Sequence, residues 1–264
     1  MKRRIQSGFT LIELLVVVAI LVALAGMVLP KLDRIDLLSK KGISANNAVG
    51  VARYIQIYKV QHNVYPDGWD SLQKANGTFA DPSNSATHTV GIEPEVSGKF
   101  TPQLLTDKQA HSLFRMGIQT FYEYANDPDK APGDQFTDTT KKLPLLTDDN
   151  SNNVQLPVVQ TTGDGAAIYA HLYPSLNGAI PSDRILVGLG FGPLNTAIGE
   201  VLLETPAYAN TDAAFTYNRH IAVFQVFNDG TRAELVTVLG ADGDRIDEEI
   251  GEYHSGYYSA PVAP

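Results

Sequence analysis

The sequence predicts an α+β protein, in which a long N-terminal helix packs on a C-terminal antiparallel β-sheet head. Two observations lead to this prediction. Positions 9–29 are almost all apolar, with Glu13 as their only charged residue, and apolar or small residues then recur at three- and four-residue spacing as far as His62, which is typical of a helix. Near the C-terminus, two apolar runs flank Asn228-Asp229-Gly230, and an Asn/Asp-Gly pair in that position is the strongest local signal for a hairpin.

The composition excludes several kinds of partner and of functional site. The chain has 264 residues, enough to bury a real core, and a formal net charge of −9. Non-specific binding of nucleic acid requires a basic face, so we expect no nucleic-acid partner. Cysteine is absent from the sequence, which excludes disulfides, thiolate zinc sites and cysteine nucleophiles. Stability must therefore come from core packing, assembly or a bound metal ion.

The apolar segment 9–29 is long enough to span a membrane as a helix, and the basic residues Lys2, Arg3 and Arg4 before it predict that the rest of the chain lies outside the cytoplasm. A cleaved secretory signal is the alternative. Against it stand the length of the run, the lack of a clean small-x-small cleavage site and the acidic Glu13. A carboxylate in lipid costs roughly 2.5–3.5 kcal/mol, which indicates a functional role for Glu13.

The order Ser7-Gly8 followed by Phe9-Thr10-Leu11-Ile12-Glu13 resembles the N-terminal signal of type IV prepilins and type II secretion pseudopilins. In that family a membrane peptidase cuts after the glycine and methylates the new terminal amine. The resemblance implies that residues 1–8 are a cleaved leader, that Phe9 becomes the methylated N-terminus, and that 9–30 forms the membrane and filament-core helix. It also implies a pilin fold.

Charge pairing gives Glu13 a physical role in assembly. After cleavage Phe9 would carry a cationic amine one helical turn away, and opposite charges attract strongly at low dielectric. The family resemblance implies that Glu13 also pairs with Phe9 of a neighbouring subunit. Pro30 removes a helix hydrogen bond and predicts a kink or a loosened turn, which in pilin-like proteins accompanies subunit packing; a simple proline at the membrane boundary is the alternative.

After Pro30 we expect an amphipathic stalk helix over 31–62 and an extracytoplasmic head over 63–264. Tyr65-Pro66 ends the helix, because the residue before proline disfavours the helical conformation. In the enlarged middle region, 77–218, the pattern predicts loops over 81–97, 126–138 and 147–153, a helix over 104–124, and strands over 166–173 and 184–189. The predicted C-terminal hairpin pairs 220–227 with 233–239.

Acidic residues and glycines follow the hairpin, in an order similar to the C-terminal calcium loop of major pseudopilins. On that comparison Asp242, Asp247, Glu248 and Glu249 are candidate Ca²⁺ ligands, because calcium prefers several hard oxygen atoms. The loop is shorter than in the family, and glutamate replaces aspartate in the acidic pair. The alternative is a solvated acidic turn in which Asp242 and Asp244 are turn formers.

No common catalytic motif is present, so we expect a structural protein and not an enzyme. The leading hypothesis is a subunit of a type IV pilus or a type II secretion pseudopilus. Its partners would be copies of itself, other pilins, the prepilin peptidase and the inner-membrane assembly platform, and it would occupy the inner membrane and then a periplasmic or surface filament. The alternative is a minor subunit whose 77–218 region is an adhesion or ligand-binding module. The residues do not distinguish pilus from pseudopilus, or major from minor subunit.

Overall fold

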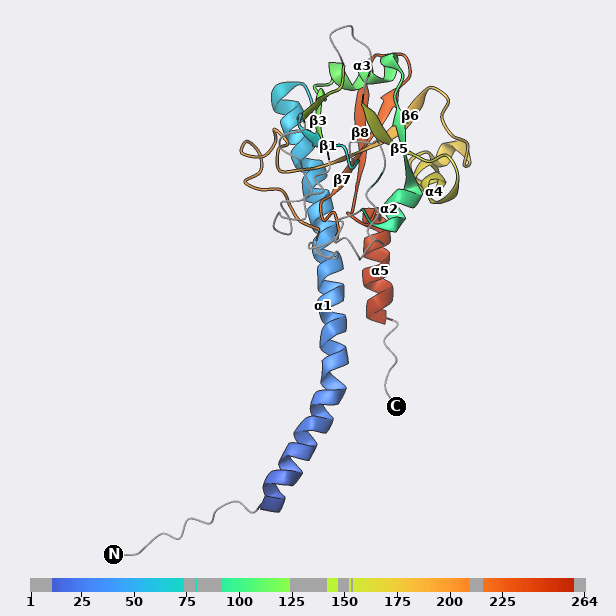
Figure 1. Ribbon diagram of the computed structural model, residues 1–264. Coiled ribbons are helices and arrows are strands. Elements are labelled where there is room, and N and C mark those ends of the chain that lie inside the picture. Colours follow the sequence, from blue (N-terminus) through green and yellow to red (C-terminus); the bar gives the residue numbers. More distant parts are fainter. Residues whose placement is uncertain are drawn as a thin grey trace, which may run out of the picture. The chain divides into compact units, whose positions relative to one another are not determined.

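The computed structural model describes residues 11–73, 79, 92–123, 142–146, 152, 154–208 and 216–258. The chain divides into two compact units, residues 1–40 and 41–264, and each is described here by itself. Helix α1, Leu11–His62, contributes its first part to the first unit and its second part to the other (Figure 1).

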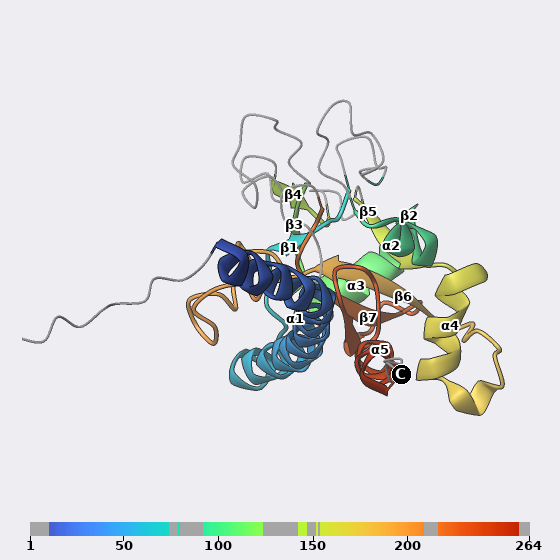
Figure 2. The ribbon, with the colours of Figure 1, turned by 90° about the horizontal axis from the view of Figure 1, so that it is seen from below.

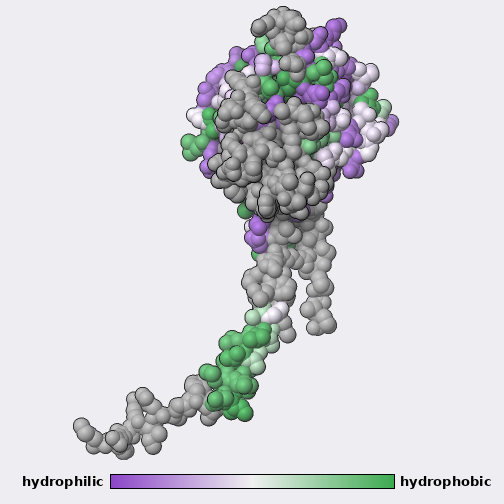
Figure 3. Space-filling view, in the orientation of Figure 1, coloured by the Kyte–Doolittle hydropathy of each residue, from purple (hydrophilic) through white to green (hydrophobic). Residues whose placement is uncertain are grey.

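In the first unit, α1 presents a sleeve of apolar side chains. From Leu11 to Leu24 the large apolar side chains are between 49% and 82% exposed, and Figure 3 shows them as a continuous apolar surface. The helical backbone continues through Pro30, where the sequence predicts a kink or a loosened turn. Within the described part of the chain, none of the helices combines the length and the apolar character that crossing a membrane requires. The span over 9–29 stays a prediction.

A left-handed residue ends α1 at the position that the sequence indicates. Asn63 has φ 60°, and its backbone N–H donates to the Lys59 carbonyl at 2.8 Å, which satisfies one of the last helical carbonyls. Tyr65-Pro66 then directs the chain into the head. The buried Tyr65 hydroxyl accepts a hydrogen bond from the backbone N–H of Leu235, which ties this turn to the sheet.

One eight-stranded sheet forms the head, and the path along it runs β2-β5-β6-β1-β3-β4, with β7 pairing with both β6 and β8. The strands are β1 (Trp69–Asp70), β2 (Phe100–Leu104), β3 (Thr120–Tyr122), β4 (Lys142–Pro144), β5 (Gln155–Val159), β6 (Arg184–Gly190), β7 (Ile221–Phe227) and β8 (Ala233–Leu239). β6 pairs with β7 along its whole length, and its other edge pairs with β5 at Val187 and with β1 at Gly190. The fold class is α+β, as predicted, but the sheet is mixed and not purely antiparallel, because β1 runs parallel to β3.

Four further α-helices and a short 3₁₀ helix accompany the sheet in the described residues. They are α2 (Pro94–Lys99), α3 (Asp107–Arg115), α4 (Gly163–Leu172), η1 (Pro174–Leu176) and α5 (Ile246–Tyr258). α2 packs beside α4, and α3 packs against β7 (Figure 2).

Several predicted elements of the middle region differ from the structure. The predicted helix 104–124 is helical only over α3, because β2 ends at Leu104 before it and β3 follows it. The predicted strand 166–173 is wrong, since these residues lie in or next to α4. Part of the predicted loop 81–97 forms α2, whereas 81–91, 126–138 and most of 147–153 lie outside the described residues. The strand at 184–189 and the hairpin of β7 and β8 are confirmed.

Aromatic side chains form the centre of the core between the second part of α1 and the sheet. Trp69 and Phe224 are fully buried, and their rings meet edge to face at 5.3 Å between centroids. The Trp69 indole N–H donates to the Pro66 carbonyl at 2.6 Å. Ile55 of α1 is also fully buried in this cluster. This core holds β7 and β8 in place, and so fixes where the chain emerges after Leu239.

Candidate functional site

The predicted processing residues fall at the edge of the described chain. Gly8 and Phe9 lie outside the described residues. Glu13 lies in the first turn of α1 as described, among exposed apolar side chains. A carboxylate is favourable there, because the N-terminal end of a helix carries partial positive charge. Pro30 lies on the helical backbone of α1.

A tight turn between β8 and α5 forms the second candidate site. The Gly240 N–H donates to the Asp244 carbonyl at 2.8 Å, and the Gly243 N–H donates to the Gly240 carbonyl at 3.1 Å. Gly243 has φ +86°, a left-handed conformation that favours glycine. The Asp242 carboxylate accepts the Asp244 N–H at 3.1 Å. The turn is therefore closed by its own backbone and by one aspartate.

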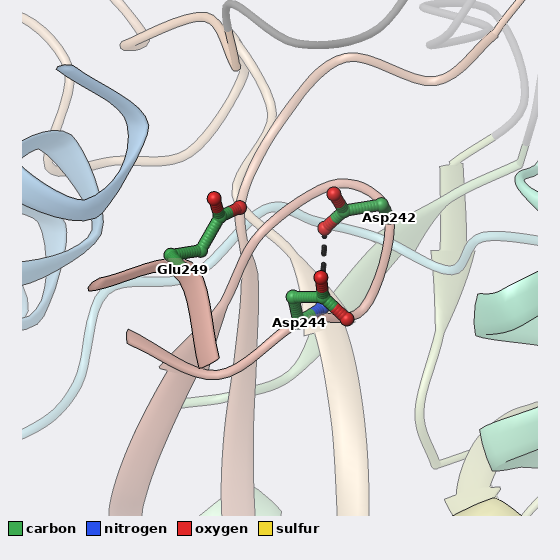
Figure 4. A group of neighbouring side chains, drawn as sticks. All are labelled: Asp242, Asp244 and Glu249. Atoms are coloured by element: carbon green, nitrogen blue, oxygen red, sulfur yellow. Dashed lines mark hydrogen bonds between the residues drawn. The ribbon is translucent and has the colours of Figure 1, made fainter. Parts of the chain in front are cut away.

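Three carboxylates meet at this turn, and we call them the acidic cluster: Asp242, Asp244 and Glu249 (Figure 4). One oxygen from each lies within 4.8 Å of the others. Asp242 and Asp244 come from the turn, whereas Glu249 comes from the first turns of α5 and is 2% exposed. Oxygen atoms converging in this way are the ligands that calcium prefers.

Tyr208 links two members of the acidic cluster. Its hydroxyl is hydrogen-bonded to Asp242 Oδ2 and to Glu249 Oε1. A phenol has one hydrogen, so it can donate to only one of these carboxylates, and the other contact requires a proton on the carboxyl group. Burial raises the pKa of Glu249 to about 7, which is consistent with a carboxyl group that keeps its proton near neutral pH. Burial also raises the pKa of Asp242.

The second oxygen of Glu249 is left without a hydrogen bond among the described residues. Glu249 Oε2 is buried and has no donor there. A buried carboxylate oxygen without a partner is costly, and a bound cation would remove that cost. The donor set and this buried oxygen together fit a divalent cation held by oxygen ligands.

Lys99 at the end of α2 approaches the cluster from the middle region. Its ammonium group donates to the Gly243 carbonyl at 2.8 Å and to Asp244 Oδ1 at 3.0 Å. The side chains of Lys99 and Asp244 are only 13% and 14% exposed. The three carboxyl groups are thus partly balanced by a partly buried positive charge from another element.

The other predicted ligands, Asp247 and Glu248, turn away from the acidic cluster. Arg245 binds Asp247 through two hydrogen bonds of 3.0 Å, and its guanidinium lies 3.2 Å from Glu248. The hydrogen bond from Arg245 lowers the pKa of Asp247. Of the four predicted ligands, the structure brings Asp242 and Glu249 together in the acidic cluster. The other two, Asp247 and Glu248, are bound to Arg245.

Sequence reasoning missed three members of the site: Asp244, Tyr208 and Lys99. Asp244 was considered only as a turn former. A helical pattern from Ile246 would have separated Asp247 from Glu249, because residues two apart on a helix point to different faces. The contacts of Tyr208 and Lys99 span 34 to 145 residues, and no local sequence signal indicates them.

Comparison with known proteins bears on the N-terminal segment. Residues 3–29 match the family described as the prokaryotic N-terminal methylation motif. The chain thus carries this motif in its N-terminal segment. Two curated relatives are each named type II secretion system core protein G. The one from Pseudomonas aeruginosa is 37% identical over 73 residues (28% of this chain and 51% of that protein), and the one from Aeromonas hydrophila is 36% identical over 75 residues (27% and 52%).

The chain spans about half the length of the curated relatives that it matches. No solved structure matches it. The methylation motif lies in the first unit with Glu13, whereas the acidic cluster lies in the second unit and outside the motif. The motif therefore bears on the N-terminal segment alone, and the acidic cluster is judged on its own geometry.

Proposed function

We propose that this chain is a structural subunit of a type IV pilus or a type II secretion pseudopilus. The observation that carries the proposal is the methylation motif over 3–29, with Glu13 inside its apolar part. The exposed apolar sleeve of α1 supports it as well, because such a surface calls for lipid or other subunits to cover it. The similarity to type II secretion system core protein G also favours a filament subunit over an enzyme.

In this proposal a prepilin peptidase cuts after Gly8 and methylates Phe9. The helix that starts at Phe9 holds the subunit in the inner membrane with its head outside the cytoplasm, and the assembly platform then delivers it to a filament. Pairing of Glu13 with the amine of Phe9, within the chain or on a neighbour, removes the cost of a carboxylate in apolar surroundings and sets the register between subunits. The filament contains copies of this chain and other pilins.

N-terminal mass analysis of the membrane-extracted protein tests this proposal. We expect a mature chain that begins at Phe9 and carries one methyl group on its amine. A chain in which Gly8 is replaced by a bulky residue, Gly8→Leu, serves as the control and should keep its leader. A mature wild-type chain that starts at another residue, or that retains residues 1–8, would contradict the proposal.

We also propose that the acidic cluster binds Ca²⁺ through Asp242, Asp244 and Glu249. Support comes from the convergence of three carboxylates and from the buried, unpartnered Glu249 Oε2. Bound calcium would supply positive charge that allows all three carboxyl groups to ionise side by side. It would thereby fasten α5 to the end of β8 in a chain that has no disulfide.

The alternative function, a minor subunit with a binding module in 77–218, has one observation in its favour. A groove of about 700 Å³ lies between the side chains of Asn47 and Tyr54 on α1 and the segment 201–207. Leu203 in this segment is 97% exposed. Such a lining favours an apolar or peptide ligand. Membrane-bound monomer that binds a ligand, without sheared filaments of this chain, would favour this alternative.

A further inference from the structure

Lys99 occupies the place at which a cation would be expected beside the acidic cluster. Its ammonium group binds one backbone carbonyl oxygen, that of Gly243, and one carboxylate oxygen, Asp244 Oδ1. These are the two kinds of oxygen that coordinate calcium in proteins. The lysine therefore uses donor atoms that a metal ion at this turn would use.

Close packing between α2 and the turn holds the Lys99 side chain in this position. A Cβ atom at Gly243 would lie 3.2 Å from the Lys99 side chain and 3.2 Å from Val96 of the same helix, α2. Val96 is fully buried. A lysine side chain that is only 13% exposed needs hydrogen-bonding partners of suitable charge for its ammonium group, and the acidic cluster provides them. α2 and the turn thus fit together with the charge pair between them.

The charges of the site favour competition between Lys99 and a metal ion. Burial raises the pKa of Asp242, and the positive charge of Lys99 opposes part of that rise while it compensates part of the negative charge of the acidic cluster. A divalent ion among the same carboxylates would be repelled by an ammonium group a few ångströms away. Repulsion at this range remains large when the groups are shielded from solvent.

We propose that Lys99 is an internal cation that competes with Ca²⁺ for the acidic cluster. Without metal its ammonium group stays bound to the Gly243 carbonyl and to Asp244, and a calcium ion binds only by overcoming or displacing it. The inference rests on the proposed calcium site and deepens it, because it gives the middle region, through α2, control over calcium affinity. With Lys99 in place, the site would bind calcium only at higher concentrations than the same three carboxylates would need without the lysine.

Titration of the full chain in detergent with CaCl₂, after removal of metal, tests this inference by calorimetry. In Lys99→Met the ammonium is lost, and we expect Ca²⁺ to bind at least about tenfold more tightly than in the wild type. Lys99→Gln, which keeps a hydrogen-bond donor without the charge, should behave in the same way. Lys99→Arg keeps the charge and should bind within about twofold of the wild type.

The matched control is Lys108→Met, which removes the same charge from the exposed start of α3. Lys108 lies against Gly230, at the opposite end of β8 from the acidic cluster, so calcium affinity should not change. A second readout is thermal melting in chelator, in which Lys99→Met should melt below the wild type and recover on addition of CaCl₂.

If Lys99→Met and Lys99→Gln both fold and bind calcium no more tightly than the wild type, Lys99 does not compete and the inference is wrong. If neither the wild type nor these variants bind calcium, the calcium proposal and this inference fail together. The proposed filament subunit is unaffected in both cases, because it is tested separately at Phe9.

Discussion

The imidazole of His220 is fully buried, and its ring lies edge-on to Tyr208 at 5.8 Å between centroids. Burial lowers the pKa of His220 to about 4, below the value near 6.5 expected in the unfolded chain. As the pH falls from 6.5 to 4, the unfolded chain takes up a proton here and the folded chain does not. We therefore expect the free energy of unfolding to fall by about 2–3 kcal/mol through this one residue between pH 7 and 4.5.

Denaturant unfolding at several pH values, for the wild type and for His220→Leu, measures this effect. Glu249 acts in the opposite direction, because its raised pKa stabilises the folded chain as the pH falls from about 7. That contribution is common to both proteins and cancels in their difference. Equal pH dependence in the two proteins would show that His220 is not held neutral.

Single residues also show where sequence reasoning reached its limit. Glu13 stands out in the sequence because a charge in an apolar run is rare whatever the fold. The acidic cluster could be predicted only in part, since composition indicates many oxygens but not their directions. Arg245 binds Asp247 and Glu248, two and three residues further along the chain, and the acidic cluster contains neither of these carboxylates.

At the level of elements, the turn between β8 and α5 should respond to calcium as a unit. Calcium at about 100 times its dissociation constant should raise the melting temperature by roughly 5–10 °C, because only the folded chain presents the site. Asp244→Asn should lose most of this rise. Asp247→Asn, whose carboxylate is bound to Arg245, should keep it.

Differential scanning calorimetry with CaCl₂ and with chelator makes the comparison. The absence of any shift in the wild type would remove the calcium proposal. An equal loss in Asp244→Asn and Asp247→Asn would mean that the ion binds among residues other than the acidic cluster.

Elements with a strong local signal could be predicted, and elements that depend on distant contacts could not. The hairpin of β7 and β8 follows from its Asn-Asp-Gly turn and from two apolar runs, of which β7 is buried almost throughout and β8 is half-buried in its middle. α4 was predicted as a strand from its apolar and aromatic residues, yet it is a helix that buries Ile168 and Tyr169. The start of α3 did carry a local signal, a capping box of Thr106 and Gln109, which would have corrected the predicted helix 104–124.

For the whole molecule, assembly should depend on the charge of Glu13. Glu13→Ala should still be cleaved after Gly8, because the leader is unchanged, but its yield of sheared filaments should fall at least about tenfold, since a charge pair in apolar surroundings is lost. Asp36→Asn is the matched control. Asp36 is exposed on the same helix and bonded to Lys40 at 2.8 Å, an i,i+4 surface pair worth only about 0.3–0.5 kcal/mol.

Electron microscopy of sheared material, with immunoblotting for the cleaved chain, separates assembly from processing. Normal filaments from Glu13→Ala would refute the pairing argument. Loss of filaments in Asp36→Asn as well would indicate a general sensitivity of the helix to lost charge.

The way β6 is shared among neighbours has a consequence for the evolution and engineering of this head. The middle region 77–218 contains β2 through β6, and β6 pairs with β7 along one edge and with β5 and β1 along the other. The strands of this region belong to the same hydrogen-bonded sheet as the C-terminal hairpin, so the region is not a separate domain. Moving 77–218 alone into another protein would leave β6 without β7, its partner along one whole edge, so a successful chimera would have to include β7 and β8 as well.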